Sequence, residues 1–157
     1  MINSIIYKTN QLSNNILLKI CEFKDTFWNY GLNSQEKWFK KYVNDTDIHY
    51  IIFEDTKIIG YGLRRLVNDY SILDNILVNQ NYRNKGYGKD IIEQLLMNTN
   101  GIVCLVCSNQ NIKFYRKNNF DLIHNIKFND KNTSQLNIMS KNFDKTKLIN
   151  LNYYNTR

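Results

Sequence analysis

Residues 76–96, ILVNQNYRNKGYGKDIIEQLL, combine three features that together could bind an anion. An aliphatic run typical of a strand leads into a polar turn with a Gly-x-Gly pair, Gly86 and Gly88, and then into an amphipathic run typical of a helix. Backbone N–H groups at a helix N-terminus point toward an anion, and glycine lets the backbone approach it closely. This order of strand, loop and helix predicts a phosphate-binding site.

Two common phosphate-binding motifs do not fit this loop. A Walker A loop needs Gly-x4-Gly-Lys-Ser/Thr, and alignment on Gly88 and Lys89 places Arg83 and Asp90 at its first and last positions. A dinucleotide fingerprint needs a third glycine where this chain has Ile91. The pattern Arg/Gln-x-x-Gly-x-Gly/Ala does fit, with the residues Arg83, Asn84, Lys85, Gly86, Tyr87 and Gly88.

This loop resembles the acetyl-CoA pyrophosphate loop of the GNAT superfamily of N-acetyltransferases. The preceding segment, ILVNQNYR, is similar to the family's strand and turn, although Gln80 stands where many members have proline. Downstream, SNQNIKFYRKNNF resembles the family segment N-x-x-A-x-x-F-Y-x-K-x-G-F. In that segment Ser108, Asn111 and Asn119 replace the first Asn, the Ala and the Gly. The resemblance covers roughly residues 50–126.

The resemblance implies a fold, a cosubstrate and a set of binding residues. The expected fold class is α/β (α+β), a single-domain GNAT fold over residues 1–143, with a mixed, mostly antiparallel central sheet flanked by helices and splayed strands at the CoA site. Residues 144–157 are expected to form a C-terminal tail of uncertain structure. The cosubstrate is acetyl-CoA, and no metal is expected. The implied cofactor-binding residues are Ile76, Leu77, Val78, Arg83, Asn84, Lys85, Gly86, Tyr87, Gly88, Lys89, Asn111 and Phe114.

Acyl transfer to an amine also needs a proton donor for the departing thiolate and a route for the proton of the amine. The resemblance assigns the acid to Tyr115, because the family places a tyrosine here near the CoA sulfur. Tyrosine has an ordinary pKa of about 10, so it is protonated at neutral pH and suits a thiol leaving group. The alternative is that Tyr115 only packs beside Phe114. Strand periodicity puts Asp74 on one face with Ile76, which makes its carboxylate a candidate base. His49 and a water relay are alternatives.

The hydrophobic pattern predicts the order β-α-α-β-β-β-α-β-α-β-β. Apolar spacing predicts a helix that ends near Gly31, and a second helix that opens near Ser34. Two further strands are expected at 119–128 and 134–142, joined by the turn 129–133. The other expected strands are 3–9, 47–54, 57–67, 70–79 and 101–108, and the other expected helices are 88–98 and 109–118.

Composition limits the location and the partners of the protein. The 157 residues carry a formal charge of +7, which favours acidic partners without choosing among them. An apolar run of about 18 residues is missing and the number of cysteines is odd, so we expect a cytoplasmic protein without a membrane partner. Cys104 and Cys107 form C-x-x-C, but residues three apart in a strand point to opposite faces, which favours core packing over metal binding.

These observations predict an acetyl-CoA-dependent N-acetyltransferase in which a small primary amine attacks directly in a ternary complex. An amino sugar, free or nucleotide-linked, is the favoured acceptor, while an aminoglycoside, a polyamine and a protein amine stay open. Arg64 and Arg65 are either a solvated edge or a clamp for an anionic acceptor. The alternatives in function are a CoA-binding pseudoenzyme or sensor and a basic nucleic-acid-binding module, although no nucleic-acid partner is expected. A homodimer is a possible assembly state.

Overall fold

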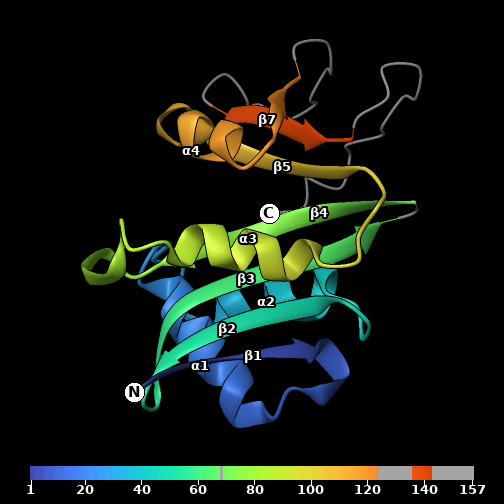
Figure 1. Ribbon diagram of the computed structural model, residues 1–157. Coiled ribbons are helices and arrows are strands. Elements are labelled where there is room, and N and C mark those ends of the chain that lie inside the picture. Colours follow the sequence, from blue (N-terminus) through green and yellow to red (C-terminus); the bar gives the residue numbers. More distant parts are fainter. Residues whose placement is uncertain (68, 124–135, 143–157) are drawn as a thin grey trace. The chain divides into compact units, whose positions relative to one another are not determined.

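The computed structural model describes residues 1–67, 69–123 and 136–142. Within them, helices and strands follow one another in the predicted order (Figure 1). The strands are β1 Ile2–Lys8, β2 Ile48–Glu54, β3 Lys57–Val67, β4 Tyr70–Val78, β5 Val103–Ser108, β6 Asp121–Leu122 and β7 Leu136–Lys141. The α-helices are α1 Asn14–Asp25, α2 Leu32–Tyr42, α3 Tyr87–Leu96 and α4 Ile112–Lys117, and short 3₁₀ turns are η1 Thr9–Gln11, η2 Gln80–Tyr82 and η3 Asn109–Asn111.

The described strands hydrogen-bond in the order β1-β2-β3-β4-β5-β7-β6. The β1–β2, β2–β3, β5–β7 and β6–β7 pairs are antiparallel, and the β4–β5 pair is parallel. The sheet is therefore mixed and mostly antiparallel, which confirms the predicted fold class. The described residues fall into two compact units: unit 1 holds 1–65 and 74–98, and unit 2 holds 66–73 and the residues from 99 onward. The predicted extent of one domain over 1–143, and the predicted splay of the strands, stay predictions.

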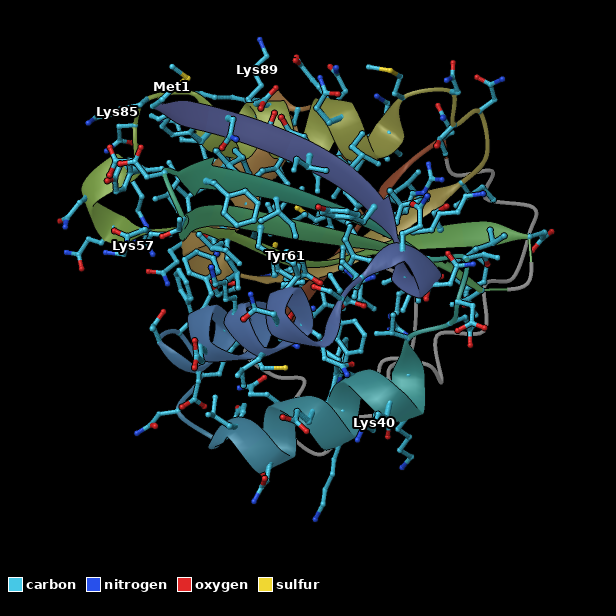
Figure 2. The ribbon with its side chains drawn as sticks, turned by 90° about the horizontal axis from the view of Figure 1, so that it is seen from below. Met1, Lys40, Lys57, Tyr61, Lys85 and Lys89 are labelled. Atoms are coloured by element: carbon cyan, nitrogen blue, oxygen red, sulfur yellow. The ribbon has the colours of Figure 1, made fainter. Side chains whose placement is uncertain are left out.

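In unit 1, helices cover both faces of the strands, with α3 on one face and α1 and α2 on the other (Figure 1). Strand β3 packs against helices on both faces, because large residues and glycines alternate along it. Tyr61 and Leu63 are fully buried in a core that also contains Ile20 and Phe23 of α1. Figure 2 shows Tyr61 between the strands and α1. Large side chains on this face of β3 thus support the helical layer that contains α1.

The opposite face of β3 carries glycine because α3 lies close to it. A Cβ atom built on Gly62 would come within 2.3 Å of Ile91 Cγ2 and 2.7 Å of Leu95 Cδ1. Since real Cβ contacts are not this short, any larger residue would push α3 away from the strand. The sequence IIGYGL therefore sets the position of α3, and with it the position of the loop that precedes α3.

The two N-terminal helices are confirmed, but the boundary between them differs from the prediction. Helix α1 begins after Ser13, whose hydroxyl accepts a hydrogen bond from the Ile16 N–H at 3.2 Å, and it ends at Asp25. Gly31 does not end this helix; it is the N-cap of α2, with φ +87° and ψ 152°. Such a backbone conformation is essentially restricted to glycine, and it turns the chain into the second helix before Ser34 is reached.

Unit 2 has its own apolar core around the start of β4 and the strands β5 and β7. Strand β4 runs parallel to β5 through the pairs Ser71↔Val103 and Ile72↔Cys104. The buried members of this core are Val67, Tyr70, Ile72, Cys104 and Ile138. The turn 129–133 and the tail 144–157 lie outside the described residues. None of the helices that the structure describes has the length and apolar character needed to span a bilayer.

Candidate active site

The predicted phosphate-binding loop of unit 1 has the backbone geometry that an anion site requires. Gly86 is the N-cap of α3 and has φ +90°, in the left-handed region that favours glycine. Apart from atoms of the adjoining chain, no atom of the described residues lies within 4 Å of the position that a Cβ on Gly86 would take. No side chain caps this end of α3, and the first N–H groups of any helix lack partners within the helix. The loop therefore offers uncapped donors beside open space.

Three cationic side chains belong to this loop and the start of α3, and Arg83 and Lys85 contact other residues of unit 1. Arg83 Nε donates a hydrogen bond to the Val78 carbonyl at 3.2 Å, which ties the loop back to the end of β4. The Lys85 ammonium lies 5.6 Å from the centre of the Tyr82 ring. In Figure 2, Lys85 and Lys89 project from the loop and the start of α3, on the side of the strands opposite to Lys40 of α2. The charge expected at the loop is thus present.

Strand β4, which the resemblance assigns to the cofactor's arm, is irregular at Asn75. This residue has φ +56° in the interior of the strand. A left-handed residue of this kind breaks the alternation of side chains, as β-bulges do. The expectation that Asp74 and Ile76 share one face is therefore wrong: Asp74 bonds Arg65 on the α2 side, whereas Ile76 lies beside the position that faces Ile91 of α3.

Asp74, the candidate base, forms a buried ion pair. Its Oδ2 accepts a hydrogen bond from Arg65 Nε at 2.6 Å, and the side chains are only 7% and 5% exposed. Arg65 also donates to the Tyr42 carbonyl at 3.4 Å and lies 5.7 Å from the centre of the Trp38 ring. These contacts fix the orientation of the Asp74 carboxylate relative to α2.

The two neighbouring arginines do not converge on one ligand. Arg64 donates to the Leu95 carbonyl of α3 at 2.9 Å, while Arg65 faces Asp74 and α2. Consecutive residues of a strand point to opposite faces, so this outcome follows from the strand itself. The pair is neither a joint clamp nor a solvated edge, because Arg65 is buried.

His49, the alternative base, lies inside the core of unit 1. Its Nδ1 is 2.8 Å from the Tyr61 hydroxyl and its Nε2 is 2.8 Å from the Thr9 hydroxyl. Burial, with the nearby Lys24 charge, lowers the pKa of His49 to about 3. A fully buried imidazole with both nitrogens engaged is a structural group.

Unit 2 contains the proposed acid, Tyr115, in the middle of α4. The residue is 8% exposed, and its ring makes edge contacts with Phe114 and Phe120 at centroid distances of 5.0 and 6.0 Å. Asn119, which replaces the family's glycine, has φ +67° just beyond the end of α4. Asparagine tolerates this left-handed conformation better than most residues, so the substitution keeps the turn. Asn111, the N-cap of α4, is exposed and donates from Nδ2 to Ser108 Oγ at 3.3 Å.

The two cysteines of the C-x-x-C pair in unit 2 contact different residues. The Cys104 thiol lies 3.8 Å from Ser140 Oγ, and the Cys107 thiol lies 3.6 Å from Met139 Sδ. Burial raises the pKa of both thiols to about 11. All three cysteines are free and buried. Among the described residues, no cluster of three or more His, Cys, Asp and Glu side chains could hold a metal ion.

Comparison with known families gives the match that decides the family. Residues 45–122 match the model described as an acetyltransferase (GNAT) domain. The chain belongs to the GNAT superfamily. It is therefore an acyltransferase, in a superfamily whose members use acetyl-CoA as cosubstrate. Comparison with curated proteins gave no significant match.

Solved structures confirm the GNAT fold. Escherichia coli ElaA superposes with a TM-score of 0.74 at 13% identity, over 90% of this chain and 99% of that one. A GNAT-family acetyltransferase from Staphylococcus aureus Mu50 gives 0.65 at 20% identity, over 90% and 98%. The Escherichia coli ribosomal-protein-S18-alanine N-acetyltransferase gives 0.65 at 14% identity, over 94% and 100%. Fold similarity over nearly whole chains at such low identity does not carry the acceptor of one GNAT protein to another.

Sequence reasoning missed the special position of Asn75 in this GNAT chain. Its side chain is buried, and its Nδ2 is the one buried side-chain nitrogen or oxygen in the described residues without a hydrogen-bond partner. A signal was present in the sequence, because Asp and Asn are both disfavoured in strands and stand side by side within the apolar run SILDNILV. Two such residues in sequence indicate a local break in the ladder.

Proposed function

We propose that this protein transfers an acetyl group from acetyl-CoA to the primary amine of a small acceptor, by direct attack in a ternary complex. The observation that carries the proposal is the loop at Gly86, where a left-handed glycine, an uncapped helix N-terminus and open space come together. A pyrophosphate is the kind of ligand that uses such donors. In the proposal this group is held by the loop residues Arg83, Asn84, Lys85, Gly86, Tyr87, Gly88 and Lys89.

The rest of the cosubstrate is assigned to β4 and to the α4 region. The backbone of Ile76, Leu77 and Val78 is proposed to bind the pantetheine arm, and Asn111 and Phe114 to contribute from unit 2. Acetyl-CoA supplies an activated thioester carbonyl when it is bound. The chain's own residues then have to orient that carbonyl, receive one proton from the amine and deliver one proton to the thiolate.

Proton transfers are assigned to Asp74 and Tyr115. When the amine nitrogen bonds to the carbonyl carbon and the C–S bond breaks, the nitrogen loses a proton and the sulfur gains one. Asp74 is the proposed acceptor of the first proton. The ion pair through Oδ2 orients its carboxylate, and Oδ1 is the oxygen proposed to accept the proton. The Tyr115 hydroxyl is the proposed donor of the second, and its phenolate is reprotonated from water.

The acceptor is proposed to be an amino sugar, free or nucleotide-linked. The support is the pair of half-buried aromatic rings Trp38 and Tyr42, 5.8 Å apart on α2, on the side of the strands where Asp74 lies. Small-molecule sites are typically lined by aromatic side chains together with a few placed polar groups. Because Arg64 points away from this side, the two arginines do not form a clamp there for the phosphates of a nucleotide-linked sugar, so the free amino sugar has the stronger support.

A panel of amines tests the reaction. The purified protein is incubated with acetyl-CoA and amino sugars, aminoglycosides, polyamines and peptides with free N-termini, and release of the CoA thiol is measured. We expect thiol release with an amino sugar. Binding of CoA, seen as a raised melting temperature, without release for any amine would support a CoA sensor instead. Absence of both would refute the proposed function.

Charge variants test the loop. Replacing Arg83 and Lys85 by Ala should weaken CoA binding roughly tenfold at low salt and less at high salt, because exposed charges are screened. The matched control replaces Lys37 and Lys40, two exposed lysines of α2, and removes the same net charge on the other side of the strands (Figure 2). If both double variants lose affinity equally, the effect is one of net charge and the loop assignment fails.

A further inference from the structure

Asn75 of β4 has two features that lower the stability of the folded protein. Its backbone has φ +56°, and its side-chain nitrogen Nδ2 is buried without a hydrogen-bond partner. A buried donor without a partner destabilises a protein, and native proteins keep few of them. Such a donor commonly has a partner that the protein itself does not supply, either a bound water or a ligand. Asn75 is therefore a candidate ligand-binding group.

The position of Asn75 in β4 indicates which atom of the ligand could accept a hydrogen bond from it. The residue before it, Asp74, is the proposed proton acceptor for the amine, and the residues after it are the proposed backbone site for the pantetheine arm. The carbonyl that reacts joins the end of that arm to the incoming amine. In the proposed function this carbonyl therefore lies against the segment 74–76 of β4, and Asn75 is the residue of that segment with a buried donor that has no partner in the described residues. This step rests on the proposed function.

The chemistry of the amide suits that position. Nδ2 is a neutral donor, so it hydrogen-bonds a carbonyl oxygen without needing a counter-charge. Negative charge develops on that oxygen as the amine attacks, and a fixed donor in a buried site stabilises the charge more than it stabilises the uncharged carbonyl. The left-handed backbone re-aims the side chain, which is a known use of bulges beside active sites. Asp74 cannot do the same work, because a carboxylate paired with Arg65 is an acceptor.

We propose that the side-chain amide of Asn75 donates a hydrogen bond to the reacting carbonyl oxygen and is a further catalytic residue of the acetyl transfer. The proposal predicts a specific pattern of losses. Removing the amide should lower kcat about 10²-fold, the effect typical of removing one such donor, while KM for the amine stays unchanged.

The variants separate the amide from the backbone conformation. Asn75→Gly keeps a residue that adopts positive φ and removes the donor. Asn75→Asp keeps the size and the tolerance of positive φ, but it offers only acceptors when ionised. The matched control is Asn98→Gly, because Asn98 also has a left-handed φ of +61° in unit 1 but is exposed at the end of α3.

Binding provides a readout that does not depend on turnover. S-ethyl-CoA has no carbonyl next to the sulfur, whereas acetyl-CoA has one. Asn75→Gly should weaken acetyl-CoA binding about fivefold, the value of one hydrogen bond, and leave S-ethyl-CoA binding unchanged. Asn98→Gly should change neither dissociation constant. Calorimetric titration of the full chain without an amine measures all of them.

Several outcomes would overturn the inference alone. They are equal weakening of acetyl-CoA and S-ethyl-CoA binding in Asn75→Gly, an unchanged kcat in both Asn75 variants, or a raised KM for the amine at unchanged kcat. The last result would assign the amide to acceptor recognition. If the wild-type protein binds neither acetyl-CoA nor S-ethyl-CoA, the proposed function fails, and this inference fails with it.

Discussion

Acid should destabilise this protein through His49, the fully buried histidine of unit 1. Both ring nitrogens lie 2.8 Å from a hydroxyl, one from Tyr61 and one from Thr9. Burial lowers the pKa of His49 to about 3, whereas an unfolded histidine has a pKa of about 6.5. Between these values the unfolded chain binds one more proton than the folded chain. The free energy of unfolding must therefore fall as the pH falls.

The size of this effect follows from the difference in pKa. The contribution of His49 is fully present above the unfolded pKa and is lost on the way down to the folded pKa. Across this range the slope is about 1.4 kcal/mol per pH unit. Between about pH 7 and about pH 4.5 the loss is roughly 2.5 kcal/mol, which is a large share of the ~5–15 kcal/mol that stabilises a typical domain.

Urea denaturation of the wild type and of His49→Gln at these two pH values measures the loss. Glutamine does not titrate, so the variant keeps every other titrating group of the chain and removes only this one. The variant is expected to be less stable at neutral pH, because it alters the contacts with Thr9 and Tyr61. Between the two pH values, however, the wild type should lose roughly 2.5 kcal/mol more than the variant. Equal losses would refute the reasoning, because they would mean that His49 accepts a proton in the folded state as readily as in the unfolded state.

Three further predictions concern packing, thiols and the buried ion pair. Gly62→Ala should lower the free energy of unfolding, measured by urea denaturation, by about 1–3 kcal/mol, since the new Cβ would lie 2.3 Å from Ile91 Cγ2. The control Gly101→Ala, whose Cβ would have its nearest atom at 3.7 Å, should lower it by less than about 0.5 kcal/mol. The three buried thiols should react with a disulfide reagent at about pH 8 only when denaturant is added, and labelling of the native protein at all three would contradict their burial and raised pKa values. Asp74→Asn should lower stability by about 3–5 kcal/mol by leaving the buried Arg65 unpaired, and a loss below about 1 kcal/mol would show that the pair is not buried in solution.

The order of the elements could be predicted from the sequence because it depends on local periodicity. The run of β3 shows this well, since its glycines alternate with large residues and each set belongs to one face. The boundary at Gly31 could not be predicted in the same way. Glycine occurs both after a helix and before one, and only the backbone angles, φ +87° and ψ 152°, show that it begins α2.

The loop of the candidate site was predictable, and the strand beside it was not. The pattern from Arg83 to Gly88 lies within six consecutive residues, so its spacing alone indicates a turn before a helix. Whether Asp74 and Ile76 share a face instead depends on the backbone angle of Asn75, which lies between them. A period of two residues assumes an unbroken strand, so a single left-handed residue moves every assignment that follows it to the other face. Asp74 itself precedes the break and bonds Arg65 on the α2 side, so it is Ile76 that moves to the other face.

Asp74 and Asn75 are consecutive buried polar residues of β4, but only Asp74 has a partner for its side chain among the described residues. Asp74 has a partner of opposite charge, Arg65, within the folded chain. Asn75 has a strained backbone and an unbonded donor, and nothing in the described residues compensates for either. Sites that lower stability persist where function needs them, and an unbonded donor recovers its cost when a ligand binds. In the proposed role of Asn75, its side-chain donor forms its hydrogen bond only when the acyl group is bound, whereas Asp74 Oδ2 already accepts a hydrogen bond from Arg65 within the protein.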